Sequence, residues 1–351
     1  MELSPSPSPS PSPAAPSSVP HVAPSGELVG RLRARYGEAA LRRQLESLHR
    51  HGPNVEDPVL WLETAVAGNF KYKEIERVER CLCGNADTRF VSRFVYWNLL
   101  GTRHCPACGL LFVSPRLTSD EVARLFSEIY FDHRDVEYWG TRRAPVFADV
   151  LRLLRRAGAT SVLDVGCAYG HFVKAASDRG LRASGCDISG DAVRIGRERL
   201  GVRLHEGTVH EVPVPAGTVD AVVSLDALYY AHDPAADLVA MRRLVAPGGH
   251  LVLRLRNVRW SAARSALRRR ERVGREVMPS EHLWGFSPRS IRALLDRLGW
   301  ETIACEPAAY SRTGLHLLQT AAMRANRLGR VLVRQAPIWT RSFNVLARRP
   351  G

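Results

Sequence analysis

Residues 161–172 read SVLDVGCAYGHF, and this stretch decides the fold. An apolar strand carries Asp164 near its end, and a loop with Gly166, Cys167 and Gly170 then turns into a helix that begins near residue 171. Glycines let the backbone approach a ligand closely, and α/β sheets bind ligands at the carboxyl edge of their strands. The loop has neither the Gly-Lys-Ser/Thr ending of a triphosphate loop nor the GxGxxG spacing of a dinucleotide loop. It therefore predicts a turn that binds a different ligand.

The chain after about residue 142 alternates helices and strands, which predicts a parallel α/β sheet. The predicted fold class is α/β, a Rossmann-like seven-stranded doubly wound sheet, with a small N-terminal helical and zinc-ribbon region. The seven candidate strands cover residues 161–165, 182–187, 203–206, 219–225, 250–256, 301–307 and 342–347.

Further motifs follow in a fixed order. The second strand ends in Gly-Cys-Asp, with Asp187 placed 23 residues after Asp164. Residues 212–230 read VPVPAGTVDAVVSLDALYY, and residues 244–257 read LVAPGGHLVLRLRN. An acid at the end of the second strand accepts hydrogen bonds from ribose hydroxyls. The ordered set resembles class I S-adenosylmethionine-dependent methyltransferases over about residues 142–347.

This resemblance implies cofactor-binding residues by position. Asp164, Gly166, Cys167 and Gly170 match the loop beneath the methionine end of S-adenosylmethionine. Asp187 matches the ribose acid, and Ser224 and Leu225 match the strand end beside the sulfonium. Thr208 stands where relatives often carry an acid that touches the adenine amino group, which departs from the family pattern.

Seven cysteines occur, and Cys81, Cys83, Cys105 and Cys108 lie within 28 residues. Four thiolates in two knuckles suit a tetrahedral, structural Zn²⁺. The first knuckle is one residue shorter than usual, so His104 is an alternative ligand, and four unligated thiols are the other interpretation. Residues 105–117, CPACGLLFVSPRL, resemble the zinc-ribbon head that precedes many methyltransferase domains, including sugar C-methyltransferases.

Residues 279–290 read PSEHLWGFSPRS. In the sugar C-methyltransferases a Tyr-x-Glu-His motif precedes a Phe-Ser helix start, and this resemblance makes Glu281 and His282 the acid/base candidates. The tyrosine is replaced by Pro279, and the alternative is that His282 only orders its loop. His232 is a second candidate.

The pocket for the methyl acceptor is expected to use aromatic side chains. We predict that Tyr229 and Tyr230 form a wall of this pocket, with Tyr138 as a further pocket residue. Packing within the core is the alternative interpretation for such aromatic residues.

The chain of 351 residues divides by composition. We predict a disordered Pro/Ser tail at residues 1–25, a helical region at 26–78 and the zinc ribbon at 79–115. We expect a linker helix and aromatic segment at residues 116–141, and the methyltransferase domain with its basic helical inserts at 142–351. No apolar run is long enough to span a membrane, and the amino terminus lacks the pattern of a secretory signal, so a cytoplasmic location is expected.

The chain has 50 Lys and Arg against 35 Asp and Glu, a net charge of +15. Two inserts, at residues 257–277 and 313–336, are rich in arginine. The second predicts an amphipathic helix carrying Arg324, Arg327 and Arg330. Such a helix either lies on an anionic membrane surface or packs on the sheet with its arginines in solvent.

Together these patterns predict a cytoplasmic enzyme, with possible peripheral membrane contact, that methylates an oxygen or carbon atom. The expected acceptor is a small molecule or a nucleotide- or lipid-linked saccharide precursor. An RNA methyltransferase is the alternative within enzymes, although the ribbon carries few arginines and no amino-methylase motif occurs. A noncatalytic scaffold that binds cofactor or membrane is the alternative outside them.

Overall fold

The computed structural model describes residues 75–92, 102–114, 116–120, 122–123, 136–267, 282–311, 316–332, 338 and 340–351. The predicted Pro/Ser tail and residues 26–74 of the predicted helical region lie outside these ranges. Residues 75 and 76, at the end of that region, form a short strand.

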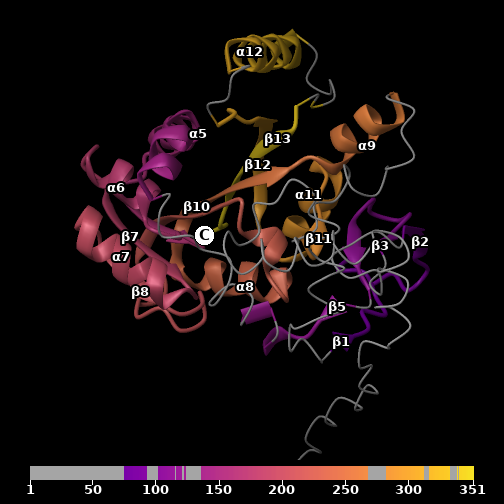
Figure 1. Ribbon diagram of the computed structural model, residues 1–351, viewed down its shortest axis with the longest axis horizontal. Helices are drawn as coiled ribbons and strands as arrows, with labels where there is room; N and C mark the ends of the chain where they lie inside the picture. Colours follow the sequence, from indigo (N-terminus) through magenta and orange to yellow (C-terminus); the bar gives the residue numbers. More distant parts are fainter. Residues whose placement is uncertain are drawn as a thin grey trace, which may run out of the picture.

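A seven-stranded sheet forms the centre of the molecule (Figure 1), which confirms the predicted α/β fold class. The strand order is β12-β13-β10-β9-β6-β7-β8. Its first strand in the chain, β6, lies inside the sheet between β9 and β7, so the turn that follows β6 lies where the strand order reverses. The strands are β6 (Ser161–Val165), β7 (Arg182–Asp187), β8 (Leu204–Glu206), β9 (Val219–Leu225), β10 (Val245–Arg256), β12 (Glu301–Pro307) and β13 (Ser342–Arg348).

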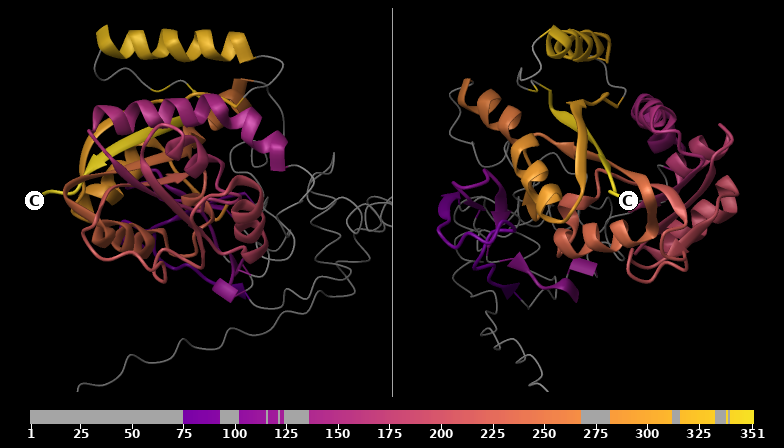
Figure 2. Two further views of the ribbon diagram at one scale, coloured as in Figure 1. Left: turned by 90° about the vertical axis from the view of Figure 1, so that its left-hand side faces the viewer. Right: turned by 180° about the vertical axis from the view of Figure 1, so that it is seen from behind.

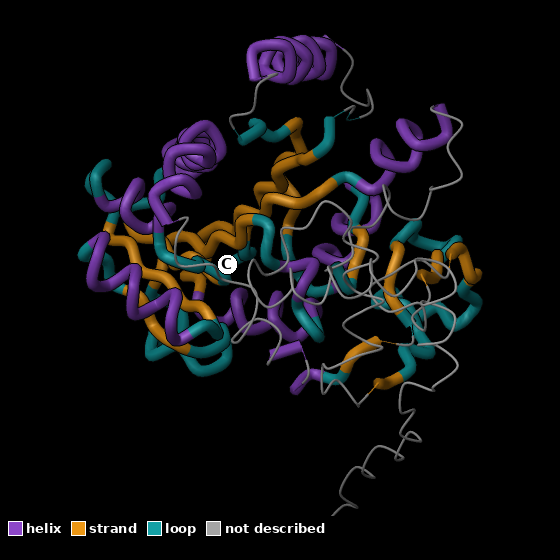
Figure 3. The backbone as a smooth tube through the Cα atoms, in the orientation of Figure 1, coloured by secondary structure: helices purple, strands orange, loops and turns teal. Residues whose placement is uncertain are grey.

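Helices cover both faces of this sheet, as expected for a doubly wound fold (Figure 3). Alternate strand residues face opposite sides. Val162 and Val223 pack with residues of α5 and α6, whereas Leu163 and Val222 belong to the cluster that includes α8 and α11. The helices are α5 (Val136–Arg156), α6 (His171–Ser177), α7 (Gly190–Leu200), the short 3₁₀ helix η2 (Leu228–Tyr230), α8 (Pro234–Leu244), α9 (Val258–Leu267), α11 (Pro288–Arg297) and α12 (His316–Leu332).

The last strand corrects the expectation of a parallel sheet. β13 runs antiparallel to both of its neighbours, β10 and β12. Pro307 at the end of β12 lies opposite Phe343 near the start of β13, so the two strands form a hairpin. The chain therefore turns back at the same edge of the sheet. Helix α12 is an insertion in that hairpin connection and not a crossover helix.

We call the described residues between 75 and 123 the head. They form most of a smaller sheet, which one strand from later in the chain joins. The head strands are β2 (Arg89–Ser92), β3 (Thr102–His104) and β4 (Leu111–Val113), and β11 (Trp284–Gly285) pairs with β4. Val113 N also donates to Leu283 O at 2.9 Å. A separate two-stranded ladder joins β1 (Ile75–Glu76) to β5 (Arg116–Leu117). Figure 1 shows the head beside β11 and α11, so chain segments far apart in sequence share one sheet.

Helix α12 lies over the tip of the β12–β13 hairpin (Figure 2) and forms the predicted helix of the second basic insert. Arg324 is exposed, as expected for an arginine in solvent. Arg327 is only partly exposed, which corrects the expectation that the arginines of this helix lie in solvent. Its Nη2 atom donates to Asp149 Oδ1 and Oδ2 at 2.7 and 2.8 Å, and Asp149 belongs to the buried face of α5. Arg327 therefore anchors α12 to the domain. In the part of the chain that the structure describes, no helix is long and apolar enough to cross a membrane.

Candidate methyl-transfer site

The turn between β6 and α6 has the backbone that its glycines predict. Gly166 and Gly170 have φ angles of 77° and 79°, in the left-handed region that glycine enters without strain. Gly166 N and Cys167 N donate to Cys186 O on β7 at 2.9 and 3.1 Å. A Cβ atom on Gly166 would lie 2.4 Å from the Cβ of Ala227, so any larger residue there would displace the loop after β9.

Asp187 ends β7 and ties the turn to the next helix. Its Oδ2 accepts a hydrogen bond from Ala168 N at 2.8 Å, and its Oδ1 accepts one from Ser189 N at 3.0 Å. Burial raises the pKa of this carboxyl, and the backbone hydrogen bonds oppose that rise. The carboxylate is therefore held in one orientation at the sheet edge, with further acceptor capacity on both oxygens.

Two buried polar side chains beside the turn have atoms without a partner among the described residues. Asp164 is 3% exposed and its Oδ1 accepts no hydrogen bond there; the same holds for Ser224 Oγ on β9. Burial raises the pKa of Asp164 to about 7, despite the nearby charge of Arg143. Buried polar atoms are rarely left unpaired, so both atoms indicate a polar ligand at this edge.

One cavity of about 470 Å³ opens onto these groups. Gly170 shapes the turn but is absent from the lining, and Tyr229 lies behind Tyr230. The backbone of Tyr138 lies in α5, but the placement of its side chain is outside the described part. The predicted residues that line the cavity are Asp164, Gly166, Cys167, Asp187, Thr208, Ser224, Leu225 and Tyr230.

Comparison with known proteins decides the family of this region. Residues 138–304 match the family described as methyltransferase domain. The chain contains a methyltransferase domain. This match confirms the predicted resemblance to class I S-adenosylmethionine-dependent methyltransferases.

Curated relatives align over part of this domain. The ubiquinone biosynthesis O-methyltransferase of Alkalilimnicola ehrlichii is 34% identical over 97 residues, which are 26% of this chain and 39% of that protein. The namesake from Sodalis glossinidius is 32% identical over 108 residues, or 28% and 43%. The chain thus spans less than half the length of these relatives. Among solved structures, a methyltransferase from Mesorhizobium loti is 20% identical with a TM-score of 0.41, covering 56% of this chain and 96% of its own.

His282 lies behind the wall of the methyltransferase cavity. Its ring stacks on Tyr229 with centroids 3.7 Å apart and meets Tyr230 edge-on at 5.1 Å. It is 3% exposed and is not among the residues that line the cavity. Burial, aided by the charges of Arg256 and Arg341, holds its pKa well below the usual range. Its catalytic role stays a prediction, and Glu281 lies outside the described residues.

The sequence prediction missed an ionic cluster at the carboxyl end of β9. Arg143 on α5 donates to Asp226 Oδ2 at 2.7 Å, and Arg254 on β10 pairs with the same carboxylate. Asp226 has a positive φ of 64°, which is rare for a residue other than glycine. The available signal in the sequence was Arg254 itself, which interrupts the apolar run of residues 251–255, LVLRL; in the structure it is 6% exposed.

Thr208 turns its hydroxyl to a neighbouring acid. Thr208 N and Oγ1 both donate to Glu211 Oε2 at 2.8 Å. The acid that relatives carry at this position is therefore replaced by a threonine hydrogen-bonded to a carboxylate from three residues later.

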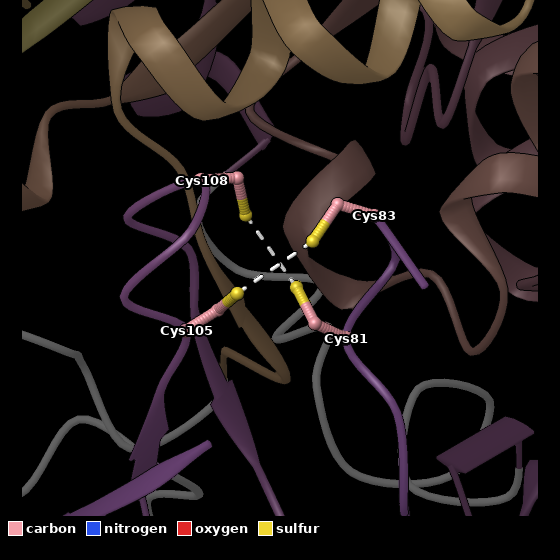
Figure 4. Close-up of side chains that lie close together, drawn as sticks. All are labelled: Cys81, Cys83, Cys105 and Cys108. Carbon is pink, nitrogen blue, oxygen red and sulfur yellow. Dashed lines mark hydrogen bonds between the residues drawn. The ribbon is translucent and has the colours of Figure 1, made fainter. Parts of the chain in front are cut away.

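The four predicted cysteines of the head converge on one point (Figure 4). Cys81 Sγ lies 3.5 Å from Cys108 Sγ, and Cys83 Sγ lies 3.6 Å from Cys105 Sγ. All four sulfur atoms lie within 4.8 Å of one another. A tetrahedral site with Zn–S bonds of about 2.3 Å needs sulfur atoms about 3.8 Å apart. The shorter first knuckle therefore reaches the site.

Proposed function

We propose that this protein transfers the methyl group of S-adenosylmethionine to an oxygen or carbon atom of a small molecule. One observation carries the proposal: Asp164 and Ser224 line one cavity beside the glycine turn, and Asp164 Oδ1 and Ser224 Oγ are buried without a hydrogen-bond partner among the described residues. The cofactor carries a cationic sulfonium and an ammonium group, and an ionised Asp164 provides the complementary charge.

The residues present fit this cofactor. Gly166 keeps the turn open to a ligand, and Asp187 offers its remaining acceptor capacity to ribose hydroxyls. Ser224 and Leu225 end β9 where the reacting centre would lie. When bound, the cofactor supplies an electrophilic methyl group, and the protein's own task is to align the acceptor and remove water and a proton.

The relatives favour oxygen as the acceptor atom, because both described above are named O-methyltransferases. A nucleotide- or lipid-linked saccharide precursor is the acceptor class suggested by the zinc-ribbon resemblance. We further propose that the four cysteines hold a structural Zn²⁺, since four thiolates leave no open position for water.

Methyl-labelled S-adenosylmethionine, incubated with fractionated cell extract and the purified full-length protein, tests this function. We expect label to enter the small-molecule or glycolipid fraction. Gly166→Val is the matched control. Its side chain would collide with the loop after β9, so we expect it to transfer no label. Circular dichroism verifies that the variant is folded.

The outcomes separate the alternatives. Label in RNA would support the RNA methyltransferase interpretation and contradict ours. No label in any fraction, with calorimetry showing cofactor binding, would support a noncatalytic scaffold. Membrane contact is tested separately, by whether Arg324→Ala reduces retention on anionic vesicles, since Arg324 is exposed.

A further inference from the structure

Three polar side chains join the head to the methyl-transfer cavity. Glu76 and Arg116 face each other across the β1–β5 ladder, and Arg116 Nε donates to Glu76 Oε1 at 2.7 Å. His232 Nε2 lies 2.9 Å from the same Glu76 oxygen. Arg116 Nη2 lies 3.3 Å from His232 Nε2. We call Glu76, Arg116 and His232 the head–cavity triad.

Each end of the triad is fixed in place. The Arg116 side chain is 8% exposed, and its guanidinium carbon lies 5.1 Å from the centre of the Trp284 ring. Trp284 Nε1 donates to Ala231 O at 2.7 Å, just before His232 in the chain. On the other side, Asp233 caps α8 by accepting hydrogen bonds from two backbone N–H groups at 3.0 Å. His232 is therefore held between a cap and a buried strand.

His232 forms part of the cavity wall. His232 lines it together with Ser224 and Tyr230, the predicted neighbours of the reacting centre and of the acceptor. The imidazole thus touches the head through Nε2 while its residue borders the cavity. Cofactor-binding groups come from the large sheet, whereas this part of the wall depends on the head.

The ionised carboxylate of Glu76 selects the tautomer of the His232 imidazole. Burial alone would raise the pKa of Glu76, but hydrogen bonds from His232 and Arg116 outweigh it and lower the pKa to about 2. An ionised carboxylate accepts only, so the shorter 2.9 Å contact needs a proton on Nε2. Arg116 is also a donor only, so its 3.3 Å approach to Nε2 is then no hydrogen bond, and Arg116 and His232 both donate to Glu76 Oε1. In a neutral imidazole Nδ1 is then the basic nitrogen, and a carboxylate partner fixes that tautomer.

We propose that His232 is the general base of the reaction and that Glu76 is its positioning residue, so that the head completes the catalytic site. This inference rests on the proposed function. The acceptor hydroxyl loses its proton to Nδ1 of His232, and the oxygen lone pair forms the bond to the methyl carbon. The C–S bond breaks with its electron pair remaining on sulfur. The imidazolium that results is balanced by the Glu76 carboxylate.

Other charged groups also lie close to His232. Arg116 on β5 lies 3.3 Å from its Nε2 atom, and Glu76 on β1 lies 2.9 Å from the same atom. On α8, Asp237 interacts electrostatically with His232, and its Oδ1 atom lies 3.0 Å from His210 Nε2. Glu76→Gln therefore removes a negative charge that lies directly against the imidazole.

Kinetics with the extract fraction that accepts label provide the first test. We expect His232→Gln to lose about 10²–10⁴-fold in labelling rate, the usual contribution of a general base. Glu76→Gln should lose less rate than His232→Gln, because it leaves the imidazole in place and removes only the carboxylate that orients it. Glu79→Gln, an exposed carboxylate on the same segment, is the matched control and should behave as wild type. Affinity for S-adenosylhomocysteine, measured by calorimetry, should stay unchanged in all three variants.

Long-range ¹H–¹⁵N spectra of full-length protein labelled with ¹⁵N-histidine provide a second test that needs no acceptor. With S-adenosylhomocysteine bound, we expect His232 to be protonated at Nε2 only, and to lose this fixed tautomer in Glu76→Gln. A wild-type His232 protonated at Nδ1 overturns the inference whatever the kinetics show. Normal labelling by His232→Gln also overturns it while leaving the proposed function intact, and a wild-type protein that labels nothing overturns the proposed function itself.

Discussion

Asp164→Asn should stabilise the cofactor-free protein at alkaline pH while weakening cofactor binding. The carboxyl has an ordinary pKa of 3.8 and a folded-state pKa of about 7, because it is buried. Between these values the folded state holds a proton that the unfolded chain has released. The stability that this proton provides is present at acidic pH and is lost as the pH rises to 7. The shift corresponds to at most about 4 kcal/mol, at 1.36 kcal/mol for each pKa unit.

Asparagine carries no charge at any of these pH values, so the variant avoids this loss. Thermal unfolding of wild type and variant should therefore diverge between about pH 4 and 8, with the wild type falling relative to the variant. Asp220→Asn is the matched control. Asp220 lies near the amino end of β9, away from the cavity, and hydrogen bonds from Thr160 and Ser161 lower its pKa to about 2. Its variant should lose stability without any change in slope above about pH 4.

Cofactor binding should favour the ionised form of Asp164, whereas folding favours the protonated form. A cationic ligand favours the ionised carboxylate, which makes up about nine-tenths of the population at pH 8 and about one-tenth at pH 6. Affinity for S-adenosylmethionine should thus weaken about tenfold over this range in the wild type. Asp164→Asn should bind more weakly at pH 8, with this dependence removed. Parallel unfolding curves, or an equal pH slope of binding in both proteins, would refute the assignment of Asp164.

Three further predictions address the rest of the fold. Arg327→Ala should lower the free energy of unfolding by about 2 kcal/mol, because it removes a charged hydrogen-bond partner from buried Asp149, while Arg324→Ala should leave thermal stability unchanged. The purified protein should contain one zinc ion per chain by mass spectrometry; Cys105→Ser should lose it, and a full zinc content in that variant would contradict the four-cysteine site. His282→Gln should flatten the fall in stability on acidification below about pH 6.5, because a buried neutral histidine resists the proton that the unfolded chain accepts; an unchanged acid limb in thermal unfolding would contradict this.

The sequence predicted the central sheet well because local patterns determine it. The strand that carries Asp164 is a short apolar run followed by turn residues. Each strand of the central sheet lies within a residue or two of its predicted bounds, apart from the earlier start of β10. The direction of β13 was not available from such patterns. A helix between two strands reads as a crossover whether or not it is an insertion in a hairpin, and only the pairing of Pro307 with Phe343 distinguishes the two.

The site was predictable where one segment carries it and missed where distant segments meet. The glycine turn supplies Gly166 and Cys167 from consecutive positions, so a motif suffices to find them. Glu76 and His232, by contrast, are 156 residues apart in the chain; Glu76 lies on β1, and His232 lies in the loop between η2 and α8. No periodicity connects such residues. Arg327 was predicted to face solvent because its helical spacing matches exposed arginines, and the spacing carries no information about Asp149 on α5.

The segment around β11 shows why the head and the methyltransferase domain form one structural unit. The sequence predicts a catalytic role for Glu281 and His282, and the strand that follows them pairs Trp284 with Phe112 of the head. Leu283 N donates to Tyr229 O on the opposite side, so the same short segment touches both the small sheet of the head and a residue that packs behind the cavity wall. Burial is continuous across it, because Phe112, Trp284 and Tyr229 belong to one hydrophobic cluster. We therefore expect distortion of the head to reach the side of the cavity that Tyr230 lines, while the turn that contains Gly166 rests on the central sheet.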